Sequence, residues 1–120
     1  MRTAVLLFAA LGGLFAVAAR ATPAGPAPAP AALTLTLRDH RFIPDTLTAP
    51  AGVRIAITLI NLDGAREEFD SSDLGVEEDV TPRAHIRFTI GPLKPGSYDF
   101  MGEAHADTAH GKLVVTAPAG

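Results

Sequence analysis

The sequence of 120 residues contains no cysteine, no tryptophan and only one tyrosine. Without cysteine, the chain can form no disulfide, no thiolate zinc site, no iron–sulfur cluster and no thiol nucleophile. Carbohydrate hydrolysis needs a cleft for the sugar as well as paired carboxylates, and a chain so poor in aromatic residues has no aromatic-rich cleft to offer. These absences remove several classes of enzyme and of metal protein.

Basic residues are also scarce, since 10 Lys and Arg stand against 13 Asp and Glu, for a formal net charge of −3. Phosphate binding requires clustered Lys and Arg, and the sequence has no such cluster, which argues against nucleic acid as a partner. Ser71 and Ser72 lack the glycine setting of a serine nucleophile, and there is no phosphate loop or dinucleotide motif. We therefore do not expect an enzyme.

The first residues have the pattern of an export signal. Arg2 supplies a positive start, residues 4–19 are apolar, and Ala19-Arg20-Ala21 is a small-x-small cleavage site. A membrane anchor is the alternative, but the apolar run of about 16 residues is short of the roughly 20 that span a bilayer. The sequence predicts a signal peptide over residues 1–21, and export without membrane insertion after cleavage.

The rest of the chain divides into a spacer and one domain. Residues 22–32 are rich in Pro and Ala and predict an extended linker. The folded domain is expected over residues 33–116, followed by a short tail at 117–120. A chain of this length holds one compact domain.

Within the domain, apolar and polar residues alternate with the period of strands. The predicted strands are residues 33–38, a short edge strand at 47–49, a central strand at 53–61, then 84–90, a strand beginning at Tyr98, and 112–116. No window has the spacing of an amphipathic helix. Several short strands separated by turns favour an antiparallel sandwich.

Two polar stretches carry the candidate chemistry. Eight of the 13 acidic residues lie between residues 63 and 79: Asp63, Glu67, Glu68, Asp70, Asp73, Glu77, Glu78 and Asp79. Residues 102–110, between the last two strands, add further carboxylates and imidazoles. Loops of a sandwich gather at its ends, so the two stretches are expected to meet at one rim. Carboxylates with imidazole suit Fe, Mn, Zn or Cu(II), whereas a solvated acidic loop is the alternative.

Single residues within these patterns have different expected environments. Glu67 stands two residues before Phe69, so a strand would turn its carboxylate toward the core side. Such a carboxylate is costly unless it is paired or binds a cation. We expect His40 and His85 to be surface residues and Met101 to fill a gap in the core.

Residues 33–116 resemble the cupredoxin-like domains of exported bacterial proteins. The matching residues are Phe42-x-Pro44, Pro50-Ala51-Gly52, Asn61-x-Asp63, Glu67-Glu68-Phe69, Pro92-Leu93-x-Pro95-Gly96-x-Tyr98-x-Phe100, and His105 before Gly111-x-Leu113-Val114-Val115. More narrowly, the segments 67–71 and 102–111 are similar to signatures of the cupredoxin module of EfeO-type iron-uptake proteins. The resemblance implies an all-β, Greek-key cupredoxin-like sandwich in the periplasm.

The departures from this family decide the chemistry that the resemblance implies. A blue-copper cupredoxin would carry His, Cys, His and Met at the positions that Glu67, Gly102, His105 and Thr108 occupy here. Because the thiolate is missing, a blue-copper electron carrier is not expected. The resemblance implies instead a carboxylate–imidazole site for periplasmic iron or copper, beside a membrane protein of the iron-permease type.

The predicted ligands of this divalent transition metal, Fe or Cu, are Glu67, Glu68, Glu103 and His105, with Glu77 and His110 in reserve. The resemblance places Glu67 and His105 at ligand positions, and Glu68 and Glu103 stand close to them in the sequence. The alternative is a metal-free cupredoxin-fold module that docks a partner through its acidic rim.

Overall fold

The computed structural model of the chain describes residues 12–13 and 29–117. Apart from residues 12–13, the predicted signal peptide therefore lies outside the described residues, as does most of the predicted linker. Strand β1 begins at Ala31, two residues before the expected start of the domain, because the backbone N–H of Ala31 bonds the carbonyl of Arg54 at 2.9 Å. In the part of the chain that is described, no helix is long and apolar enough to cross a membrane.

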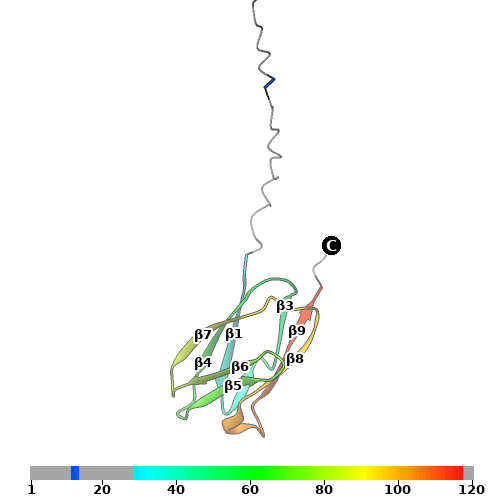
Figure 1. Cartoon of the computed structure of the whole chain (residues 1–120). Coiled ribbons are helices and arrows are strands. Elements are labelled where there is room, and N and C mark those ends of the chain that lie inside the picture. Colours follow the sequence, from blue (N-terminus) through cyan, green and yellow to red (C-terminus); the bar gives the residue numbers. More distant parts are fainter. Residues whose placement is uncertain (1–11, 14–28, 118–120) are drawn as a thin grey trace, which may run out of the picture.

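The domain is a sandwich of two sheets (Figure 1). One sheet has the strand order β2-β1-β4-β7, with bounds Arg41–Ile43, Ala31–Arg38, Ile55–Asn61 and His85–Ile90. The other has the order β3-β9-β8-β5-β6, with bounds Thr46–Pro50, His110–Thr116, Gly96–Met101, Glu67–Ser71 and Val76–Val80. A single 3-10 turn, η1 (Glu103–His105), lies between β8 and β9. The predicted all-β sandwich is confirmed.

The pairing is mixed, so the expectation of an antiparallel sandwich holds for most strand pairs and fails for two. Strand β1 pairs with β4 in parallel, and β3 pairs with β9 in parallel. The chain crosses to the second sheet at β3 before it returns to lay β4 beside β1, so these two neighbours run in the same direction. Parallel neighbours require such a crossover, which alternation of apolar residues along one strand does not reveal.

The alternating apolar residues pack between the two sheets. In β4, the side chains of Ile55, Ile57 and Leu59 are buried, as the period-two pattern predicts. At one end of the sandwich, Phe69 stacks on Phe100 with ring centroids 4.8 Å apart. This aromatic layer forms the floor beneath the polar residues of that rim, because Phe69 follows Glu67 on the same face of β5.

The acidic stretch is a pair of strands, not a loop. Strands β5 and β6 pair antiparallel from Glu67 opposite Val80 to Ser71 opposite Val76. Inward positions of β5 are buried and outward positions are half-buried. The alternation therefore sends the carboxylate of Glu67 inward and places those of Glu68, Asp70, Glu77 and Asp79 on the outer face of the sheet.

Gly111 provides a test of this packing. It lies opposite Phe100 in the β8–β9 pairing, and a Cβ there would overlap the Phe100 ring and stand 2.8 Å from the carbonyl oxygen of Asp45. We expect Gly111→Ala to lower the free energy of unfolding by about 1–3 kcal/mol, measured by urea denaturation, because overpacking shifts neighbouring groups. The control is Gly64→Ala, where the nearest atom is an Arg83 side-chain nitrogen at 3.9 Å. Equal stability of both variants would contradict this account.

Candidate metal centre

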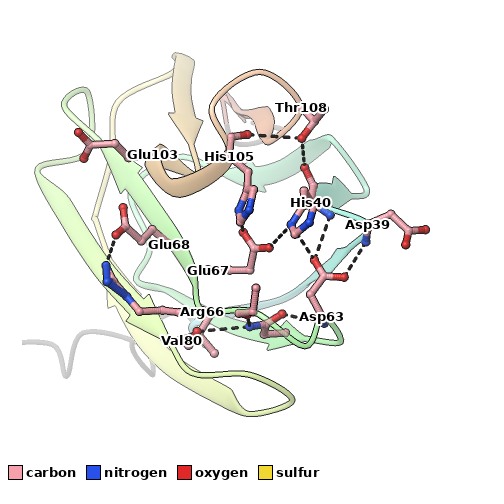
Figure 2. A network of polar contacts seen from close by, with 12 residues as sticks. Asp39, His40, Asp63, Arg66, Glu67, Glu68, Val80, Glu103, His105 and Thr108 are labelled. Carbon is pink, nitrogen blue, oxygen red and sulfur yellow. Dashed lines mark hydrogen bonds and ion pairs between the residues drawn. The ribbon is translucent and has the colours of Figure 1, made fainter.

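A buried carboxylate lies between two imidazoles at the rim of the sandwich (Figure 2). The side chain of Glu67 is 0% exposed. Its Oε1 lies 2.6 Å from Nδ1 of His40, and its Oε2 lies 3.0 Å from Nδ1 of His105. The two imidazole rings stack, with centroids 3.6 Å apart and an interplanar angle of 16°. We call His40, Glu67 and His105 the rim site.

His40 reaches the site from the tight turn between β1 and β2. Both turn residues, Asp39 and His40, have a positive φ, of 52° and 56°, as a two-residue hairpin turn requires. The left-handed conformation costs a residue with a Cβ roughly 1–2 kcal/mol. The carboxylate of Asp63 compensates, because it accepts the backbone N–H of Asp39 at 2.8 Å and that of His40 at 3.0 Å.

Asp63 is held in turn by Asn61, the last residue of β4. The buried Asn61 side chain accepts the backbone N–H of Asp63 at 2.9 Å. Its amide nitrogen donates to the carbonyl oxygens of Ala65 at 2.8 Å and Thr81 at 3.1 Å. This one amide therefore connects the end of one sheet to the loops that precede β5 and follow β6.

His105 comes from the closed loop around η1. Within this loop, the backbone N–H of Gly102 donates to the carbonyl of Ala109 at 2.9 Å, and that of Ala109 donates to the carbonyl of His105 at 2.9 Å. The hydroxyl of Thr108 donates to the carbonyl oxygen of His40 at 2.5 Å. The same loop thus presents one imidazole and holds the backbone of the other.

The electrostatics of the site favour a protonated imidazole beside Glu67. The hydrogen bond to Glu67 raises the pKa of His40, with further contributions from the nearby negative charges. Burial acts to raise the pKa of Asp63, but the backbone N–H groups of His40 and Asp39 outweigh it, so this pKa lies below its ordinary value. The carboxylate of Glu67, with Asp63 beside it, therefore favours a positive charge on His40.

The structure divides the four predicted ligands between two places. Glu67 and His105 meet in the rim site, where His40 joins them. Glu68 and Glu103 lie with Asp70 in a separate group on the outer face, which we call the outer acidic cluster. In each group the possible ligand atoms lie within 4.8 Å of one another. The four predicted residues therefore do not share one small volume, because Glu67 and Glu68 point to opposite faces of β5.

The outer acidic cluster is open to solvent and partly compensated. Arg66 donates to Glu68, and it also reaches Asp79 at 3.2 Å. Asp70 accepts the backbone N–H of Glu103 at 3.2 Å. Burial, together with the neighbouring carboxylates Glu68 and Glu103, raises the pKa of Asp70 to about 6. The reserve residues Glu77 and His110 line the groove beside this cluster, away from the rim site.

His40 was expected at the surface, and its contacts in the rim site were not predicted. Its side chain is 41% exposed, yet one ring nitrogen contacts Glu67. The Asp39-His40 pair directly follows an alternating strand, which is where a hairpin turn is expected. The pair is hard to recognise as a turn, because hairpin turns of this type usually contain Asn-Gly or Asp-Gly. His85 is exposed on β7, as expected. Met101 is 40% exposed on the outer face of β8 and fills no core gap, contrary to the expectation.

Two packed sheets with a polar site at one rim define the chain as a Greek-key β-sandwich protein. A family model described as a cupredoxin-like domain matches residues 6–115, and the chain belongs to this family. An uncharacterized protein of Rickettsia prowazekii (strain Madrid E) is 40% identical over 81 residues, which are 68% of this chain and 65% of that protein. The chain thus spans less than two thirds of this relative.

Solved structures share the fold at low sequence identity. Auracyanin A, a blue copper protein from Chloroflexus aurantiacus, is 15% identical, with a TM-score of 0.64 over 73% of this chain and 100% of that chain. A second structure is the metal binding domain of the Cu(I)-exporting ATPase CopA from Streptococcus pneumoniae D39, solved with Cu(I). It is 13% identical, with a TM-score of 0.66 over 75% of this chain and 89% of that chain. Amicyanin from Paracoccus versutus is 18% identical, with a TM-score of 0.56 over 71% of this chain and 81% of that chain.

A blue-copper donor set does not fit this chain. There is no cysteine to supply a thiolate, and the position that the resemblance assigns to it is Gly102. A Cβ at Gly102 would stand 3.0 Å from both the Cβ of Ala109 and the carbonyl oxygen of Glu68. The donors that are present are two imidazoles and a carboxylate, which suit a borderline divalent ion.

The link between Glu67 and His40 can be measured directly. We expect Glu67→Gln to lower the pKa of His40 toward the ordinary 6.5, because the hydrogen bond to the carboxylate is the main cause that raises it. An NMR titration of the His40 ring in metal-free protein measures this shift. Glu77→Gln removes an exposed carboxylate of the same hairpin and is expected to leave the pKa of His40 unchanged.

The raised pKa of His40 also determines how the stability of the folded protein changes with pH. Since the folded-state pKa of His40 is raised above 6.5, the stabilisation from its charged form is present below pH 6.5 and is lost as the pH rises through the folded-state pKa. In Glu67→Gln this pH dependence is expected to become smaller. An unchanged titration of His40 in that variant would contradict the role of the carboxylate.

Proposed function

We propose that this protein is an exported, periplasmic metal-binding accessory protein that carries iron or copper as a divalent ion in the rim site. The observation that carries the proposal is the buried carboxylate of Glu67 held between Nδ1 of His40 and Nδ1 of His105. It is not an enzyme in this proposal, and the metal is its cargo.

The protonation of the site supports exchange with a cation. Both Nδ1 atoms face the carboxylate, so a hydrogen bond joins each imidazole to Glu67 in the metal-free protein. The hydrogen bond to Glu67 raises the pKa of His40, and a divalent cation would displace the proton of its charged form, because imidazole binds metals in its neutral form. Binding is therefore expected to release protons and to weaken as the pH falls.

The donor set supports the choice of metal. Two imidazoles and one carboxylate with open positions are typical of Fe(II) sites and also suit Cu(II). The side chains of His40 and His105 are 41% and 31% exposed, so an ion can reach them from solvent and keep water at its remaining positions. Partial exposure of this kind favours reversible loading, as a carrier requires.

The wider role follows from the resemblance to the cupredoxin module of EfeO-type iron-uptake proteins. The matching segments, residues 67–71 and 102–111, supply Glu67 and His105 to the rim site. The partner proposed on this basis is a membrane protein of the iron-permease type that receives the metal.

A second candidate function is docking without metal. The outer acidic cluster and its neighbours on β6 leave a shallow, strongly negative face lined by Glu68, Asp70, Glu77, Glu78, Asp79 and Glu103. Such a face attracts a basic partner through its field, an effect that salt screens. In this case, the hydrogen bonds of Glu67 only satisfy a buried carboxylate.

Calorimetric titration with Fe(II), Cu(II), Mn(II) and Zn(II) separates the two functions. We expect His40→Ala and His105→Ala to weaken binding of the preferred metal at least tenfold, about 1.4 kcal/mol. His85→Ala, which removes an exposed imidazole on β7, is the control. Glu103→Gln is expected to bind as the wild type does, since Glu103 lies outside the rim site.

The proposal fails if the wild type binds none of these metals tighter than about 1 mM. It also fails if His40→Ala and His105→Ala both bind as tightly as the wild type. Either result favours docking through the acidic face.

The absence of a thiolate determines the visible absorption that we expect from bound Cu(II). We expect Cu(II) to produce only weak d–d absorption in the purified protein, because no cysteine can form the Cu–thiolate bond of a blue site. Visible absorption during the titration measures it. An intense blue charge-transfer band would contradict the donor set assigned above.

A further inference from the structure

A row of different donor side chains crosses the outer face of the five-stranded sheet. Asp70 on β5 lies opposite Met101 on β8, and Met101 lies opposite His110 on β9. Directly opposed residues point to the same face, with Cβ atoms about 4.5–5.5 Å apart. Carboxylate, thioether and imidazole therefore stand side by side on three neighbouring strands. We call Asp70, Met101 and His110 the outer row.

The outer row lies in a groove and is separate from the rim site. The open groove, of about 910 Å³, is lined by all three residues and by Glu103. In β8, Phe100 is buried and Met101 is 40% exposed, so the thioether is on the solvent face. Glu67 points the other way, into the sandwich. An ion in the groove would touch none of the three residues of the rim site.

The combination of donors distinguishes this groove from an ordinary acidic surface. A single exposed methionine is common and has no functional meaning. Here, however, the only methionine besides Met1 has an exposed imidazole directly across the strand pair and a carboxylate on its other side. Thioether sulfur is a soft ligand that selects Cu(I), and imidazole also suits copper.

We propose that Met101 and His110, with Asp70 as the third donor, form a second metal site that binds Cu(I). The thioether and the imidazole contribute no charge, and the carboxylate balances the single charge of Cu(I). Glu103 adds a second carboxylate at the edge of the groove, next to Asp70, whose carboxylate accepts its backbone N–H at 3.2 Å. The chain would then hold a hard-to-borderline ion at the rim and a soft ion on the outer face.

The methionine methyl group reports directly on this site. The chain contains only Met1 and Met101, so the Met101 signal in a spectrum of ¹³C-methyl-labelled protein is assigned by its loss in Met101→Leu. We expect one equivalent of Cu(I), added without oxygen, to shift this signal. A methyl signal that stays in place while Cu(I) binds would overturn the proposal.

Competition with a chromophoric Cu(I) chelator measures the affinity. We expect Met101→Leu and His110→Asn each to bind Cu(I) at least tenfold more weakly than the wild type, while His85→Asn, an exposed imidazole on β7, binds as the wild type does. All three positions are on the surface, so the variants are expected to fold, and circular dichroism checks this. Wild-type affinity in both outer-row variants would overturn the proposal.

Glu67→Gln separates this site from the rim site. We expect it to leave Cu(I) binding and the Met101 shift unchanged, because the outer row does not include Glu67. If Glu67→Gln abolishes Cu(I) binding and Met101→Leu does not, Cu(I) binds at the rim. That outcome overturns the second site and leaves the proposed function intact.

Discussion

A carboxylate buried away from water needs hydrogen-bond donors beside it, and the rim of this protein is organised around that requirement. Glu67 is fully buried, and loss of hydration would be costly without partners. Both of its oxygens face an imidazole, one from residue 40 and one from residue 105. In the described part of the chain, no buried side-chain nitrogen or oxygen lacks a hydrogen-bond partner. The fold therefore brings together two histidines far apart in the sequence to satisfy one glutamate.

The histidines are positioned through their backbones more than through side-chain packing. Asp63 holds the left-handed turn that carries His40, Asn61 holds Asp63, and Thr108 bonds the carbonyl of His40 from the loop that carries His105. Because these bonds connect both sheets and the η1 loop, a change at any one of them is transmitted to the distance between the imidazoles. The site is thus preorganised by the sandwich, as metal centres require of their surroundings.

The same sandwich fold occurs in a blue copper protein. Auracyanin A shares the fold at 15% identity, but here a Cβ at Gly102 would stand only 3.0 Å from Ala109 and from the carbonyl oxygen of Glu68. A thiolate could not be restored by one substitution without moving the loop. The three residues of the rim site lie on two turns and at one strand end. This is why the fold alone does not fix the chemistry.

Alternation of Leu, Ile, Val and Phe was sufficient to predict the sandwich. The spacing of two residues between Glu67 and Phe69 also predicted an inward carboxylate, because side-chain direction in a strand depends only on the local period. The parallel pairing of β1 with β4, the strands within the acidic stretch and the role of His40 were not predictable in this way. Each depends on which distant segments become neighbours. In the sequence His40 is one residue of a two-residue turn. It becomes a partner of Glu67 only in space, since a hydrogen bond across 27 positions exists only once both sheets have closed.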